Sequence, residues 1–207
     1  MHPSAPKPSG PACYGTGMVT RSQKQHSVPT LPGWIAGVAD FTRTFADSDA
    51  RIAFAIELAR LNVEHASGGP FGAAVFDDAG RLIAVGVNRV EPLQSSLAHA
   101  EIVALAAAQR MSGRARLNGD GRRYTLATSA QPCCQCYGAI VWAGLDELLV
   151  GARAEDTELL AGFDEGPLPA DWTGELERRG IRVVRDLRRD AACAVLAAYA
   201  RLGRPRY

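Results

Sequence analysis

"RYTLATSAQPCCQCYGAIVWAGLDELLVGAR", residues 123–153, combines two apolar stretches with a short helical stretch between them. The first apolar stretch ends at Ser129, a helix opens at Pro132, which is a favoured residue in a first helical turn, and the second apolar stretch begins at Glu147. A strand, a helix and a strand in succession are typical of a crossover that joins parallel strands of one sheet. This stretch therefore predicts an α/β fold.

The residues upstream predict a helix followed by a hairpin. "DSDARIAFAIELARLNVEH" offers Asp47 or Ser48 as the N-cap of a helix whose apolar residues recur at helical spacing. "GGPFGAAVFDDAGRLIAVGVNRV" reads as two strands, Phe71–Asp77 and Leu82–Val87, joined by a tight turn. We expect these two strands to pair antiparallel.

The remaining elements complete a layered domain. A helix is predicted over Ala98–Met111, a last strand over Ile181–Arg185 and a last helix over Asp190–Arg201. Together the elements predict a three-layer α/β/α sandwich around a mixed five-stranded sheet, with the hairpin at one edge. We expect residues 47–207 to form this domain. Residues 1–46 are rich in Pro, Gly, Ser and Thr, which predicts a flexible or loosely attached extension.

Charge, hydropathy and cysteine content limit the possible partners and location. The formal net charge is +1, which argues against a nucleic-acid-coating protein, so nucleic acid is not an expected partner. No apolar run approaches the roughly 20 residues of a membrane helix, and no secretory signal opens the chain, so no membrane contact is expected. Five cysteines, three of them crowded together, form a poor disulfide framework and indicate thiols in a reducing, cytoplasmic compartment.

Two of the crowded thiols are spaced for a metal ion. Cys133 and Cys136 lie three residues apart at the start of a predicted helix and share one of its faces, whereas Cys134 points elsewhere. His99 opens the helix that precedes the crossover, so the two helix starts can meet at one end of the sheet. Three such ligands leave a fourth position for water, which is the arrangement of catalytic zinc. The sequence thus predicts Zn²⁺ held by His99, Cys133 and Cys136.

Glu101, two residues after His99, is the candidate catalytic acid and base. His-x-Glu followed by Pro-Cys-x-x-Cys is the zinc deaminase signature, in which the glutamate moves protons and does not bind the metal. Taken singly, these residues have ordinary alternatives: a redox Cys-x-x-Cys pair, a partly buried imidazole, and a carboxylate that complements the helix dipole. Their order on these elements favours the catalytic interpretation.

The chain resembles members of the cytidine deaminase-like superfamily, and within it bacterial guanine deaminases. The resemblance runs from about Asp47 to Tyr207. The segments that carry it are "GGPFGA" (Gly68–Ala73), "NRV" with Asn88, "AHAE" (Ala98–Glu101), "PCCQCYGAIVWA" (Pro132–Ala143) and "AGFDE" (Ala161–Glu165).

This resemblance implies the substrate contacts. It implies that the Asn88 amide and Ala100 contact the base, that Trp142 covers the pocket, that Asp164 reads the edge of guanine, and that Tyr207 matches a chain-terminal tyrosine. It also implies a homodimer that exchanges C-terminal segments, so Asp164 and Tyr207 serve either the pocket of their own chain or that of the partner chain. From the residues alone, Asn88 could equally satisfy a turn, Trp142 could lie in the core, and Tyr207 could be a frayed end.

The chain departs from the family pattern close to the predicted metal ligands. The usual Cys-Glu-Pro before the first cysteine is Ala130-Gln131-Pro132, the usual Pro-Met between the ligands is Cys134-Gln135, and "EPLQSSLAH" lacks the common Asp-Pro-Thr. None of these departures touches the zinc set. We expect Gln131 and the Ser95-Ser96 loop to influence which ring is accepted.

The expected function is zinc-dependent hydrolytic deamination of a small purine base, guanine to xanthine with release of ammonia. Three alternatives stay open. Another aminated ring or nucleoside, such as guanosine, an aminotriazine or cytosine, would use the same chemistry in a different pocket. A tRNA adenosine deaminase would use the Arg-rich C-terminal part of the chain, and a scaffold protein with an inert zinc would turn over no amine.

Overall fold

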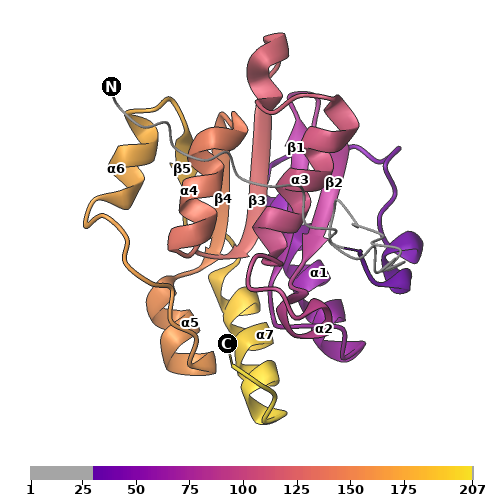
Figure 1. Cartoon of the computed structure of the whole chain (residues 1–207), viewed down its shortest axis with the longest axis vertical. Coiled ribbons are helices and arrows are strands. Elements are labelled where there is room, and N and C mark those ends of the chain that lie inside the picture. The colour runs from indigo at the N-terminus through magenta and orange to yellow at the C-terminus, as the bar shows by residue number, and fades with distance from the viewer. Residues whose placement is uncertain (1–29, 207) are drawn as a thin grey trace, which may run out of the picture.

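The computed structural model describes residues 30–206, which form a sheet with helices on both faces (Figure 1). The strand order is β2-β1-β3-β4-β5. β1 is antiparallel to both β2 and β3, whereas β3, β4 and β5 are parallel, which confirms the predicted mixed sheet with a hairpin at one edge. The strands are β1 Gly72–Asp77, β2 Leu82–Val87, β3 Tyr124–Ala130, β4 Glu147–Ala152 and β5 Arg182–Val184.

The helices join these strands and cover them. The described part of the chain contains α1 Ser48–Glu64, α2 Val90–Leu93, α3 Ala100–Ser112, α4 Cys134–Ala143, α5 Ala154–Ala161, α6 Trp172–Glu177 and α7 Arg189–Arg201, with 3₁₀ segments at Gly33–Gly37 and Leu117–Asp120. The short helices α2, α5 and α6 were not predicted individually, because four to eight residues carry too little periodicity to stand out.

Side chains of the sheet point alternately to its two faces and pack into two hydrophobic cores, one on each face. In β1, Ala74 and Phe76 join the core under α1 and α7, while Ala73 and Val75 join the core under α3 and α4. All seven residues of β3 are buried, as a strand covered on both faces must be. The predicted three-layer architecture is confirmed.

Close packing of α3 on the sheet fixes the position of its first turn. A Cβ added to Gly86 of β2 would lie 2.0 Å from the backbone oxygen of Ala100 and 2.5 Å from the backbone nitrogen of Ala104. Only glycine allows the helix to approach the strand this closely. The start of α3, with His99 and Glu101, is therefore held against the sheet.

Residues 30–46 differ from the expected loose extension. Ile35 and Phe45 are buried in the core under α1, and the Phe45 ring contacts the rings of Phe54 and Phe76 at centroid distances of 5.0 Å. Burial of these apolar and aromatic side chains holds residues 30–46 against the domain, although their composition predicted a loose segment. The predicted behaviour of residues 1–29 lies outside the described residues.

The helix that carries the cysteines begins two residues later than predicted. Pro132 precedes α4, Cys133 is its N-cap with extended backbone (φ −66°, ψ 173°), and the carbonyl of Cys133 accepts a hydrogen bond from the Tyr137 N–H. Cys136 then falls in the first turn of α4. Both cysteines remain at the helix start, where unpaired backbone N–H groups favour a thiolate.

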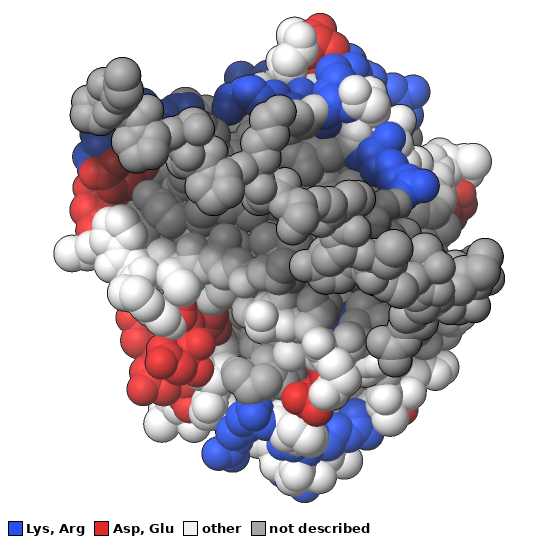
Figure 2. All heavy atoms as spheres, viewed as in Figure 1, with Lys and Arg blue, Asp and Glu red and all other residues white. Residues whose placement is uncertain are grey.

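Charges of both signs are dispersed over the molecular surface. On the face in Figure 2, acidic side chains gather over α5, whose first turn contains Glu155 and Asp156, and basic side chains form separate groups elsewhere. No helix within residues 30–206 is long and apolar enough to cross a membrane.

Candidate active site

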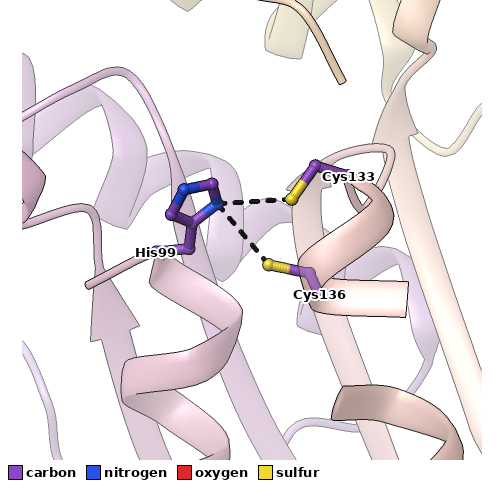
Figure 3. A group of neighbouring side chains, drawn as sticks. All are labelled: His99, Cys133 and Cys136. Atoms are coloured by element: carbon purple, nitrogen blue, oxygen red, sulfur yellow. Dashed lines mark hydrogen bonds between the residues drawn. The ribbon is translucent and has the colours of Figure 1, made fainter. Parts of the chain in front are cut away.

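The starts of α3 and α4 meet at one end of the sheet and bring the three predicted ligands together. His99 is the N-cap of α3, and Cys133 is the N-cap of α4. Figure 3 shows the imidazole facing both sulfurs. The Nδ1 atom of His99 lies 3.4 Å from the Cys133 Sγ and 3.6 Å from the Cys136 Sγ, and the three ligand atoms all lie within 4.8 Å of one another.

The donor set and its spacing fit zinc. One imidazole nitrogen and two thiol sulfurs are ligands that Zn²⁺ favours. Tetrahedral zinc, with Zn–N and Zn–S bonds of about 2.0 and 2.3 Å, requires nitrogen and sulfur to lie about 3.6 Å apart. The observed separations of 3.4 and 3.6 Å match that requirement. These three residues could therefore hold zinc with one coordination position left for another ligand.

The two ligand thiols are electrostatically coupled. The Cys136 thiol, His99 and the Cys136 backbone N–H all stabilise negative charge on Cys133 and lower the pKa of Cys133 to about 4. The same contact with Cys133, together with burial, raises the pKa of Cys136. Cys133 is thus a thiolate before any metal binds, which is the form that coordinates zinc.

Glu101 projects from the first turn of α3 into the same site. Its side chain is only 6% exposed, its Oε1 accepts a hydrogen bond of 3.0 Å from the Thr128 hydroxyl, and its Oε2 lies 3.5 Å from the Cys136 Sγ. Burial, followed by the negative charge of Cys133, raises the pKa of Glu101. A buried carboxyl group beside the ligand set is placed to exchange protons there.

A narrow pocket opens onto this group of side chains. Its cavity volume is about 30 Å³. The rings of Phe71 and Phe163 contact each other edge to face, with centroids 5.1 Å apart. The lining comprises these two aromatic residues and Asn88, His99, Ala100, Glu101, Gln131, Cys133, Asp164 and Glu165. The lining combines aromatic surface with hydrogen-bonding groups, as a site for an aminated ring requires.

Asn88 and Ala100 both line this pocket, and their contact with the base stays a prediction. Asn88 is 1% exposed, and its side-chain oxygen accepts hydrogen bonds from the backbone N–H groups of Gly69 (3.4 Å) and Val90 (3.2 Å). Its amide nitrogen has no partner within residues 30–206. The asparagine therefore both satisfies a turn and keeps a donor available, so the two interpretations left open by the sequence are compatible.

Asp164 and Glu165 approach the pocket from the segment between α5 and α6. Asp164 lines the pocket of its own chain, and its Oδ1 accepts a 2.8 Å hydrogen bond from the Gly166 N–H. Burial, followed by the charge of Glu101, raises the pKa of Glu165 to about 9. Sequence reasoning missed Glu165, although it is the last residue of the "AGFDE" motif.

Trp142 does not line the pocket of the single chain, so the role over the pocket that the resemblance implied stays a prediction. It stands near the end of α4 opposite to Cys133, is 74% exposed, and lines surface hollows with residues such as Ile102 and Leu145. The physical reason is distance along the helix, because nine residues at 1.5 Å each separate Trp142 from Cys133 by about 13 Å. Phe71 and Phe163 supply the aromatic surface instead. Tyr207 lies outside the described residues.

Comparisons with known proteins agree with this geometry. The family model described as the cytidine and deoxycytidylate deaminase zinc-binding region matches residues 47–152. The guanine deaminase of Bacillus subtilis (strain 168) is 38% identical over 127 residues, which is 61% of this chain and 78% of that protein. The solved guanine deaminase from Nitrosomonas europaea shares 46% identity with a TM-score of 0.79, over 83% of this chain and 94% of that one. A solved mutant protein in complex with 8-azaguanine shares 46% identity with a TM-score of 0.78, over 83% of this chain and 96% of that one.

Proposed function

The chain belongs to the family of cytidine and deoxycytidylate deaminases defined by their zinc-binding region, and from this premise we propose that it deaminates guanine to xanthine with release of ammonia. The protein is a zinc-dependent hydrolase. One observation carries the proposal: a buried carboxyl group, Glu101, lies beside a His/Cys/Cys ligand set at the bottom of a pocket lined by aromatic and hydrogen-bonding side chains.

His99, Cys133 and Cys136 would hold zinc, which would supply a water that is nucleophilic at neutral pH. Glu101 accepts one proton of the attacking water and delivers it to a ring nitrogen, then takes the remaining hydroxyl proton and delivers that one to the departing amine. The Thr128 hydroxyl holds one carboxylate oxygen of Glu101 at 3.0 Å, which leaves the other oxygen directed toward the ligand set.

The other pocket residues orient the ring. Phe71 and Phe163 offer apolar contact, and the Asn88 amide nitrogen offers a donor. Burial raises the pKa of Glu165 to about 9 in the metal-free protein, which favours a protonated carboxyl group that offers a second donor in the pocket lining. Asp164 provides an acceptor for ring N–H groups. Together these groups match the donors and acceptors along the edge of guanine.

The pocket lining favours a free base over the alternatives. It offers aromatic and hydrogen-bonding side chains for a flat ring and contains no Lys or Arg that would bind an RNA phosphate. The similar proteins named guanine deaminase also support guanine. Another aminated ring, such as cytosine or an aminotriazine, remains the second candidate because it would use the same zinc chemistry.

The direct test measures ammonia released by the zinc-loaded protein from a panel of amines. The panel contains guanine, guanosine, cytosine, adenine, an aminotriazine and a tRNA anticodon stem. We expect guanine to be the best substrate, with guanosine and the RNA released unchanged. Ammonia from another ring at a higher rate than from guanine would replace guanine as the substrate, and no ammonia from any amine would leave only the scaffold alternative.

We further propose that the protein is a cytoplasmic homodimer that exchanges its C-terminal segments. Exposed apolar side chains support an interface between copies: Leu97, Met111 and Trp142 are 63%, 66% and 74% exposed on or beside α3 and α4. Free thiols among the described residues support a reducing compartment. Light scattering in solution is expected to give the mass of two chains, and the mass of one chain would contradict the dimer.

A further inference from the structure

Gln131 is a pocket residue with an uncommitted side chain. It lies between the end of β3 and Cys133, it is 7% exposed, and its backbone N–H donates a 2.8 Å hydrogen bond to the carbonyl of Ala152. Its side-chain amide has no hydrogen-bond partner within residues 30–206, yet the residue lines the pocket. The backbone is thus fixed while the amide remains available.

The amide of Gln131 is open to the pocket. Neither of its polar atoms is among the fully enclosed, unpartnered side-chain atoms of residues 30–206, so the amide is accessible to a molecule that enters the pocket. Other polar groups of the same pocket are at least partly engaged: Glu101 binds Thr128, and the Asn88 oxygen binds two backbone N–H groups. The unused donors and acceptor of Gln131 therefore point to a partner that occupies the pocket.

We propose that Gln131 is a specificity-determining residue that binds the lactam edge of the purine. This inference rests on the proposed function. Guanine presents an N1–H donor beside the O6 acceptor, and an amide is complementary to both, with Oε1 accepting from N1–H and Nε2 donating to O6. A carboxylate at this position could only accept, and its charge would repel O6.

The purine 2-aminopurine separates this role from a structural one. It carries the same ring and the same amino group at C2, but it has no oxygen at C6 and its N1 is an acceptor. With guanine, Gln131 makes two hydrogen bonds, whereas with 2-aminopurine it makes one. Loss of the amide must therefore lower kcat/KM for guanine more than kcat/KM for 2-aminopurine.

The experiment compares kcat/KM for guanine and 2-aminopurine in the zinc-loaded parental protein and in Gln131→Met, which keeps the length of the side chain. We expect the ratio of guanine to 2-aminopurine to fall about tenfold, mainly through KM for guanine. Gln131→Leu provides the same test if the methionine variant does not fold. Gln109→Met is the matched control, because Gln109 lies on α3 and its amide bonds the Ala115 carbonyl outside the pocket. That variant should keep the parental ratio.

Three results would overturn the inference. If both substrates lose the same factor while zinc content is unchanged, Gln131 only supports the fold. If neither rate changes, the amide does not meet the ring. If the parental protein and the Gln109→Met control release no ammonia from guanine, the proposed function fails as well, and this failure is recognisable because it does not depend on residue 131.

Discussion

At the scale of single residues, the proposed reaction depends most on Glu101. The carboxyl group is buried, bonded to Thr128 and adjacent to Cys136, but it is not part of the ligand set. Glu101→Gln keeps the shape and the hydrogen bond to Thr128 while removing the proton acceptor. We expect zinc content and folding to stay unchanged and ammonia release to fall by about 10²-fold to 10⁴-fold.

A matched control for this variant is Glu91→Gln, which alters an exposed glutamate of α2 in the same way. Parental turnover in Glu91→Gln and lost turnover in Glu101→Gln would support the assigned role. Parental turnover in both variants would show that the proton is carried by another group.

Glu165 makes the free energy of unfolding depend on pH. In the metal-free protein, burial raises its pKa from 4.5 to about 9, so the folded state holds a proton that the unfolded state releases between these pH values. Its contribution to the free energy of unfolding is fully present below pH 4.5 and is lost as pH rises toward 9. We expect Glu165→Gln to gain stability relative to the parental protein at pH 8.5.

Thermal unfolding of metal-free parental protein and Glu165→Gln at pH 5.5 and pH 8.5 measures this difference. An equal difference in Tm at both pH values would show that Glu165 is already ionised in the folded protein at the lower pH.

The residue scale also shows what the sequence could predict about the site. His99 and Glu101 share one helix start and the two ligand cysteines share another, so local pattern was sufficient to identify these residues, whereas their meeting depends on the sheet. The position of Trp142 relative to the pocket could not be predicted, because a motif gives its place along α4 but not the end of the helix at which the pocket opens. The state of Glu165 was not predictable, since its pKa is set by burial and by Glu101, which is far away in sequence.

At the scale of elements, the start of α4 supports the segment that closes the pocket. The Cys134 N–H donates a 2.9 Å hydrogen bond to the carbonyl of Glu165. Gly166 has φ +67°, and a Cβ added there would lie 2.7 Å from the Cys134 Sγ. The hydrogen bond and this close contact hold the segment that contributes Asp164 and Glu165 to the pocket lining.

Gly166→Ala is expected to lower kcat/KM for guanine and to reduce Tm. Gly113→Ala is the matched control, because Gly113 has φ +66° and an added Cβ meets nothing within 4 Å. The control should cost about 1 kcal/mol of stability from backbone conformation alone and leave kcat/KM unchanged. Equal behaviour of the two variants in both measurements would show that contact with Cys134 does not matter.

The elements themselves were predictable to different degrees. Continuous apolar strands and the long helices α1, α3 and α7 were predicted correctly, because burial leaves a clear periodicity in the sequence. The start of α4 was placed two residues early, since Pro132 is equally compatible with an extended backbone. Residues 30–46 are held in place by contacts of the Phe45 ring with Phe54 and Phe76, and local pattern does not predict such contacts.

At the scale of the whole molecule, the sheet brings together residues that are distant in the chain. Antiparallel pairing of β1 with β3, and parallel pairing of β3 with β4, place the starts of α3 and α4 at one end of the sheet. We propose that this arrangement holds one catalytic zinc ion through His99, Cys133 and Cys136.

Native mass spectrometry of the purified protein tests this claim most directly, with Cys136→Ser compared against Cys134→Ser. We expect one zinc ion per chain in the parental protein and in Cys134→Ser, whose sulfur lies outside the ligand set. Cys136→Ser is expected to lose both the zinc ion and the ability to release ammonia from guanine. A parental protein that deaminates guanine with no divalent metal bound, or a Cys136→Ser variant that retains full zinc, would contradict it.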